Sequence, residues 1–180
     1  MSIIVDGTNG ITVPKITSTG LVDISGASAG QIKFPAAQNT SSDANTLDDY
    51  EEGTWTPTLN FGGASVGLVY TGQVGKYTKV GNVVTVQCYI SLSNKGSSSG
   101  GAYISGLPFP TKSSGTYTRC PMYINNLTSS MGAGEASYAP NASTSVTLTY
   151  MSSGTLSSAV TSAMINNTSD FMVTVSYLTD

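Results

Sequence analysis

The sequence predicts an all-β protein in two parts. An N-terminal extended stalk or anchor with short β-segments precedes a C-terminal antiparallel β-sandwich head of jelly-roll-like type. Three observations lead to this prediction. Charged residues make up 9% of the 180 residues, whereas the exposed faces of helices are normally filled with Glu, Lys and Arg. In residues 83–92 every second residue, from Val84 to Leu92, is apolar. Beyond residue 53, short apolar runs recur at the 8–12-residue spacing of strands in a sandwich.

The clearest predicted strand is residues 83–92. Alternate side chains of a strand point to opposite faces, so one face should be apolar and face a core. That face consists of Val84, Val86, Cys88, Ile90 and Leu92. The preceding Gly81-Asn82 pair is a hairpin signal, which predicts that residues 75–80 form the partner strand.

The rest of the head reads as strands separated by turns. The predicted strands are residues 54–61, 66–70, 102–107, 116–127 (interrupted at Pro121), 144–151 and 171–178. Pro57 places the first of these at a sheet edge. Residues 160–165 read as a short strand or a single helical turn, followed by a turn at Asn166-Asn167. The predicted exposed loops are residues 93–101, 111–115, 129–143 and 152–158, which would form a tip if they gathered at one end.

Residues 1–46 carry small apolar clusters separated by Gly, Pro, Asn and Ser. No cluster has a partner in sequence that is large enough to form a core, and a short β-segment is unstable alone. Another copy of the chain would supply the missing partner, so the strip predicts an oligomer. The alternative is a partly disordered tail, but the clusters are too regular and too apolar for a tail that is fully exposed to solvent. The expected oligomer or anchor contacts are Ile3, Ile4, Val5, Ile11, Val13, Ile32 and Phe34.

Residues 48–57 are interpreted as a neck between the two parts, which places the domain boundary between residues 52 and 53. The neck residues are Asp48, Asp49, Tyr50, Glu51, Glu52 and Trp55, the only tryptophan. Paired carboxylates can perform acid–base chemistry, but a local run at a boundary favours a solvated or cation-binding neck. Trp55 could stack on a sugar, although a lone Trp on the apolar side of a strand is more often a core anchor.

Composition argues against several classes of function. The net charge is −3 and the seven cations are scattered, so no basic patch for nucleic acid is expected. Histidine is absent, which removes the commonest general base and metal ligand. The two cysteines, Cys88 and Cys120, make neither a disulfide framework nor a zinc site. No apolar run reaches membrane-span length, and no signal peptide is recognised. The sequence therefore predicts no catalytic residues, cofactor, metal or membrane insertion.

Two stretches resemble a segment that recurs in bacteriophage tail-fibre and related virion fibre proteins. They are GQIKFPAAQNTSSDANTLDDYEEGTWTPTLNFGG, beginning at Gly30, and YTGQVGKYTKVGNVVTVQCYI, ending at Ile90. Residues 47–58 are the most specific part. The resemblance implies a virion structural protein, made in the bacterial host cytoplasm, that forms a homotrimer with a β-sandwich head.

The expected function is a short trimeric fibre, either a tail fibre or a fibre tip, that contacts the host cell surface. Its N-terminal part would bind other virion proteins, and its head would bind a host surface glycan or protein. The alternative is a head fibre, decoration, collar or baseplate protein with no receptor-binding role. A glycan-cleaving tailspike is disfavoured because carboxylates are few and histidine is absent. The receptor-facing candidates are Tyr103, Tyr117, Tyr123 and Tyr138.

Overall fold

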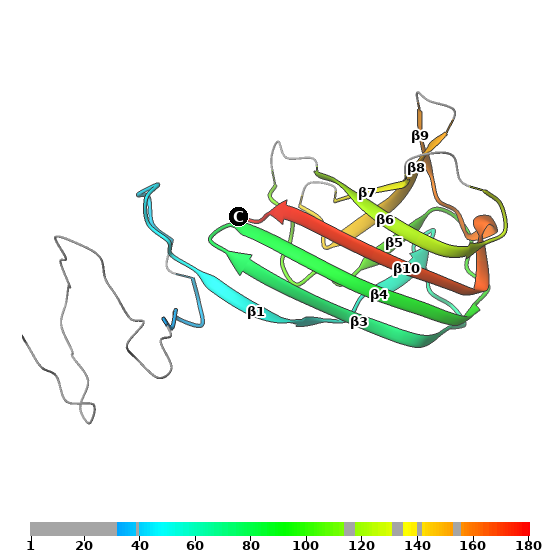
Figure 1. The fold of residues 1–180 in the computed structure, drawn as a ribbon, viewed down its shortest axis with the longest axis horizontal. Helices are drawn as coiled ribbons and strands as arrows, with labels where there is room; N and C mark the ends of the chain where they lie inside the picture. Colours follow the sequence, from blue (N-terminus) through cyan, green and yellow to red (C-terminus); the bar gives the residue numbers. More distant parts are fainter. Residues whose placement is uncertain (1–31, 39, 114–117, 131–134, 140–141, 153–155) are drawn as a thin grey trace, which may run out of the picture. The chain divides into compact units, whose positions relative to one another are not determined.

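The head is an antiparallel β-sandwich, as the sequence predicts (Figure 1). A computed structural model describes residues 32–38, 40–113, 118–130, 135–139, 142–152 and 156–180. The chain divides into two compact units, residues 1–33 and 34–180, and the second contains all the described strands. Within the described residues, the one helical element is the 3-10 turn Ser162–Met164, which agrees with the single helical turn expected over residues 160–165.

The strands follow one another in a continuous antiparallel order, β1-β3-β4-β10-β6-β7-β8-β5-β2, with β9 paired to β8. Their bounds are β1 Tyr50–Trp55, β2 Thr58–Phe61, β3 Leu68–Val80, β4 Val83–Lys95, β5 Ala102–Ser105, β6 Thr118–Leu127, β7 Glu135–Ala139, β8 Ser145–Ser152, β9 Leu156–Ala159 and β10 Ile165–Leu178. We call the layer of β1, β3, β4, β10 and the second half of β6 sheet A. The layer of β7, β8, β5, β2, β9 and the first half of β6 is sheet B.

The core lies between the two sheets and is filled by alternate residues of their strands. On β4, Val84, Val86 and Ile90 are buried and Cys88 is half-buried. The predicted two-residue period of this strand is therefore confirmed. The largest fully buried side chains across the two layers are Phe61, Phe171, Leu59, Ile90, Ile104, Leu148, Ile165, Val84, Val86, Val146, Val160 and Val175. Burial of each such side chain contributes about 1.5–3 kcal/mol before entropy is counted.

Trp55 marks the point where the chain crosses from sheet A to sheet B. It ends β1, lies in the core, and its indole Nε1 donates to the Lys76 carbonyl at 3.3 Å. Gly75 makes room for it, since a Cβ at that position would lie 2.6 Å from the indole nitrogen. Trp55 is thus the core anchor that the sequence favours. The predicted single strand over residues 54–61 is wrong, because the chain leaves β1 after Trp55 and enters β2 at Thr58, with Pro57 between them. Both strands lie at edges of the continuous order, as expected from Pro57.

Further details of the predicted strand pattern are wrong. The strands expected at residues 66–70 and 75–80 are one strand, β3. The expected loops over 129–143 and 152–158 contain β7 and β9. The expected turn at Asn166-Asn167 lies inside β10, where the pairing with β6 shifts register between Ile165 and Asp170. Pro121 does not interrupt β6. It sits where this strand leaves β7 and joins β10, so its missing N–H falls where ladder pairing changes partner.

Val86→Asp should unfold the head. Val86 is buried on β4 between Tyr77 of β3 and Val175 of β10, and an unpaired carboxylate there would cost several kcal/mol. Thermal unfolding followed by circular dichroism measures the effect. Ser93→Asp is the matched control because Ser93 is an exposed residue of the same strand. An unchanged melting temperature for Val86→Asp would show that the strand register is wrong.

Candidate functional site

A buried ion pair fixes the neck to the head. The Asp49 carboxylate pairs with the Lys79 ammonium of β3, and the two residues are only 5% and 3% exposed. Lys79 Nζ also donates to Gln38 Oε1 at 2.9 Å and lies 5.5 Å from the centre of the Phe109 ring. The Asp49 carbonyl accepts from the Gly81 amide at 2.9 Å. The expectation of a solvated or cation-binding neck is therefore wrong for Asp49, because a lysine from the head neutralises it.

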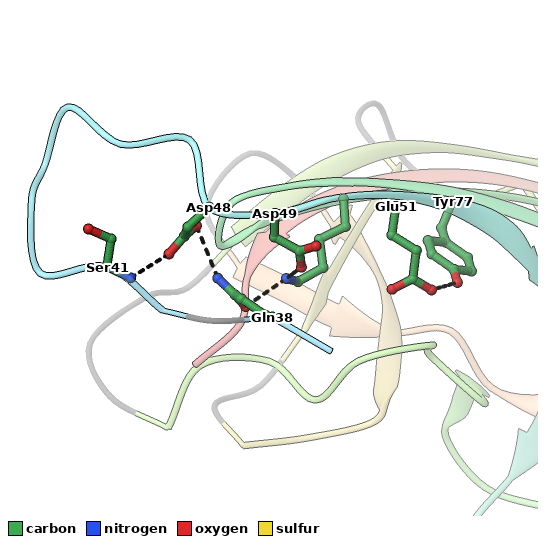
Figure 2. A network of polar contacts seen from close by, with 7 residues as sticks. Gln38, Ser41, Asp48, Asp49, Glu51 and Tyr77 are labelled. Atoms are coloured by element: carbon green, nitrogen blue, oxygen red, sulfur yellow. Dashed lines mark hydrogen bonds and ion pairs between the residues drawn. The ribbon is translucent and has the colours of Figure 1, made fainter. Parts of the chain in front are cut away.

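Asp48 closes the segment before the neck into a loop. Its carboxylate accepts the Ser41 amide at 2.9 Å and the Gln38 side-chain amide at 3.2 Å, as Figure 2 shows. The Ser41 hydrogen bond is the main cause that lowers the pKa of Asp48 below its ordinary value of 3.8. Gln38 thus bridges two charged groups, donating to Asp48 and accepting from Lys79. We call Gln38, Ser41, Asp48, Asp49 and Lys79 the neck clamp.

Glu51 and Tyr77 extend the neck clamp along β1. The Tyr77 hydroxyl donates to the Glu51 carboxylate, and this hydrogen bond is the main cause that raises the pKa of Tyr77 to about 12. The Tyr77 ring packs edge-on against Phe109, with ring centres 5.5 Å apart. Gly53 permits this arrangement, since a Cβ there would lie 2.5 Å from the Tyr77 hydroxyl oxygen. The inner side of the neck is therefore matched closely to β3 and to the loop that carries Phe109.

The neck carboxylates do not form a catalytic pair. Glu51 and Glu52 follow one another on β1, so their side chains point to opposite faces of sheet A. Glu52 accepts from the Tyr50 hydroxyl on the outer face, which raises the pKa of Tyr50. Within the described residues, no group of three or more His, Cys, Asp or Glu side chains could hold a metal ion.

The predicted oligomer contacts fall mainly outside the described residues. Ile3, Ile4, Val5, Ile11 and Val13 all lie there. Ile32 is 70% exposed, and Phe34 is half-buried with its ring centre 6.5 Å from that of Tyr50.

The candidate receptor-facing tyrosines do not form one surface. Tyr103 lies on β5 between two buried residues, so it faces outward from sheet B. Tyr123 is an exposed residue of β6 and faces outward from sheet A. Tyr117 and the side chain of Tyr138 lie outside the described part of the chain. The two described candidates thus lie on opposite sides of the sandwich.

The predicted loops do not gather at one tip. The β3–β4 hairpin at Gly81 contacts Asp49, so we call that end of the sandwich the neck end and the other the far end. The Lys112 amide donates to the Leu178 carbonyl at the end of β10, and the Ala142 amide donates to the Thr111 carbonyl. Residues 111–113 and Ala142, from two of the predicted loops, therefore lie at the neck end. The predicted loop over residues 93–101 begins only at residue 96, because β4 extends to Lys95. Loop 96–101 lies at the far end, where the Gly100 amide donates to the Ser162 hydroxyl. Ser152 and Leu156, which flank the turn between β8 and β9, also lie there.

Sequence reasoning missed Lys79, Gln38 and Phe109. Lys79 occupies the same strand phase as Gly75 and Tyr77, which face inward. A lysine on the apolar phase of a strand is itself a signal, because a buried lysine requires a partner. Gln38 and Phe109 carry no such signal, since their role depends on tertiary contact. Cys88 and Cys120 are not joined in a disulfide, and burial raises the pKa of the Cys88 thiol to about 12.

Comparison with known proteins relates the fold to that of a solved structure. No family model matches the chain, and no curated protein matches it. The fold is similar to the crystal structure of the Dettilon tailspike protein, with a TM-score of 0.60 and 23% sequence identity. The similarity covers 71% of this chain and 23% of the tailspike chain. At this identity the likeness establishes a shared fold. In the described residues, no helix is long and apolar enough to cross a membrane.

Lys79→Met should lower the free energy of unfolding by about 3–5 kcal/mol, because it leaves the Asp49 carboxylate buried without a partner. Urea denaturation measures this change. Lys76→Met is the matched control, since Lys76 is an exposed lysine of the same strand. The double variant Asp49→Leu with Lys79→Met should recover most of the loss, as apolar replacement of a buried pair often does. A loss below about 1 kcal/mol, as for surface pairs, would contradict the burial of the pair.

Acid should open the Asp48 loop. The folded pKa of Asp48 lies below the unfolded value of 3.8, so its contribution to stability is complete above that pH and is lost as the pH falls through the folded value. The Ser41 amide proton shift, followed by nuclear magnetic resonance, should titrate with a midpoint below 3.8. The titration should disappear in Asp48→Asn, which retains an oxygen acceptor. A midpoint at or above the ordinary value would show that the Ser41 hydrogen bond is absent.

Proposed function

We propose that the chain is a structural subunit of a bacteriophage virion, namely a short homotrimeric fibre whose head reaches the host cell surface. The main support is the shared fold with the Dettilon tailspike protein over 71% of this chain. The fibre-like sequence of residues 30–90 points to the same kind of protein independently. In this proposal residues 1–52 hold the fibre to the particle and to its own copies, and residues 53–180 form the exposed head.

The geometry of the neck supports an attached head. A head on a flexible tether needs no specific contact between tether and domain, whereas here five residues of the neck clamp join the incoming chain to β3. The ion pair is buried and its lysine makes a further hydrogen bond, so the last segment before β1 is held in one geometry. The far end of the sandwich, with loop 96–101, then lies opposite the neck end and is the surface available to a host.

The location of the protein on the particle is tested by immunogold electron microscopy with antibodies against residues 53–180. Gold at the tail tip or tail fibres supports the proposal. Gold confined to the capsid or collar favours the decoration alternative. Absence of label from purified particles, with the free protein as positive control, would refute a virion role.

Removal of residues 1–33 should leave a folded head that no longer joins the particle. The truncation keeps the neck clamp, since Gln38 is its first residue, and keeps the compact unit that begins at residue 34. Its melting temperature should therefore match that of the full chain. Incorporation is measured by complementing particles that lack the protein and then probing purified virions. Truncated protein that still incorporates would contradict the anchor role of the N-terminal part.

Host contact is measured separately by binding labelled full-length protein to host cells, with unlabelled protein as competitor. Saturable binding that the competitor removes is the expected result. Folded protein that does not bind to cells that the phage infects would contradict receptor contact, and the structural role alone would remain.

A further inference from the structure

The outer face of sheet A carries its side chains in four ordered rows. Strand pairing places one residue of each strand directly opposite the next. The first apolar row is Tyr50, Val80, Val83 and Leu178. The two polar rows that follow are Glu52, Thr78, Thr85 and Ser176, then Thr54, Lys76, Gln87 and Thr174. The second apolar row is Val74, Tyr89, Met172 and Tyr123. Two apolar rows therefore flank two polar rows on one face of the sheet.

Both apolar rows are open to solvent in the described part of the chain. Seven of their eight side chains are 39–55% exposed, and the eighth, Leu178, is partly exposed. Large side chains directly opposite one another on a sheet form a continuous patch rather than scattered residues. Continuous exposed apolar patches mark surfaces that meet a partner. Tyrosine and methionine, which provide four of the eight residues, are enriched at protein interfaces.

We propose that this face is the surface through which copies of this chain pack against one another, side by side and in parallel. Its size suits this partner. Sheet A has five strands, spaced at about 4.8 Å, and nine consecutive residue pairs join β10 to β4, each rising about 3.4 Å. The face thus measures about 24 Å by about 31 Å, or roughly 740 Å². A stable specific interface needs about 800 Å² from each partner.

The charges on the face also favour a second copy. Across the four rows, Glu52 and Lys76 are the charged residues, one of each sign, and they lie in adjacent rows. The charges within the four rows cancel, and Asp170, which accepts from the Tyr89 hydroxyl just beyond the second apolar row, adds one negative charge at that end of the face. Two copies would therefore meet with little like-charge repulsion across the four rows, whereas a polyanion or a cationic surface would find no complementary field there.

The position of the first apolar row accounts for the parallel arrangement. That row begins at Tyr50, the first residue of β1, immediately after the neck clamp. This step rests on the proposed function, in which the N-terminal parts of several copies lie together at the neck end. In the proposed arrangement, a rotation axis that runs along the strands relates the copies. Each row of one copy then lies level with the same row of its neighbour. Apolar rows then meet apolar rows.

The polar rows would form a hydrated band between these two contacts. They line a shallow groove of about 570 Å³ that includes Glu52, Lys76, Thr85 and Gln87. Hydroxyl and amide groups of two copies can be bridged by ordered water, which is common in stable interfaces.

The test is sedimentation velocity of the full chain and of variants at micromolar concentration. Wild type is expected to be oligomeric. Met172→Glu should weaken association about a hundredfold, because it places like charges opposite one another in a desolvated contact, and should sediment as a monomer where wild type does not. Val66→Glu is the matched control, since Val66 is 63% exposed in the turn before β3. It should remain oligomeric.

Circular dichroism shows whether each variant is folded, and Tyr123→Lys, at the β6 end of the same row, provides a second disruption if Met172→Glu does not fold. A monomeric wild type would overturn the proposal. So would an oligomeric wild type that both disrupting variants leave intact. A third contrary result is a monomer in which a tyrosine-modifying reagent reaches Tyr89 and Tyr123 only after residues 1–33 are removed, because the chain would then cover its own face. None of these results decides whether the protein is part of the virion, which the immunogold experiment tests independently.

Discussion

The ion pair between Asp49 and Lys79 is the interaction on which the position of the neck depends. Its two charges are removed from water, so each must be satisfied by the other and by neighbouring dipoles. Gln38 and the Phe109 ring provide the remaining contacts to Lys79. Such a pair adds little net stability compared with an apolar replacement, but it tolerates almost no change of geometry. Here it selects one register of β1 on β3 and one path for the chain that precedes it.

The two sheets of the sandwich are joined by the chain itself as well as by the core, so the position of the neck is fixed relative to both. β1 and β2 are consecutive in the chain but lie on different sheets at the two ends of the strand order. Trp55 fills the corner between them, and β6 connects the two layers by pairing with both β7 and β10. These two connections, one at each side, join the layers through backbone as well as through the core. A displacement of the neck would therefore move the whole head rather than one sheet.

Sequence patterns could predict the elements whose side chains alternate strongly. The strands at residues 83–92 and 171–178 and the burial of Trp55 are of this type. β7 has the sequence EASYA and β9 the sequence LSSA, which offer little apolar contrast, so these strands depend on pairing with β8 rather than on their own pattern. Asn166 and Asn167 have turn composition, yet they lie within β10, in its irregular stretch. The Asn166 side chain donates to the Asn126 carbonyl and the Asn167 side chain accepts from the Lys95 amide, contacts that a sequence pattern does not show. The burial of Asp49 was missed because its partner lies thirty residues away.

The rows on sheet A illustrate a second limit of the sequence pattern. Period two shows which residues of one strand share a face, but the rows exist only once the register between strands is known. Residues 83–92 alone would suggest a mixed outer face with Val83, Thr85, Gln87 and Tyr89. Register then sorts these into two apolar and two polar rows across four strands. A uniformly apolar face would bind many partners at any offset, whereas alternating bands match only when two copies align. In the proposed interface, the two polar rows would therefore disfavour contacts that are out of register.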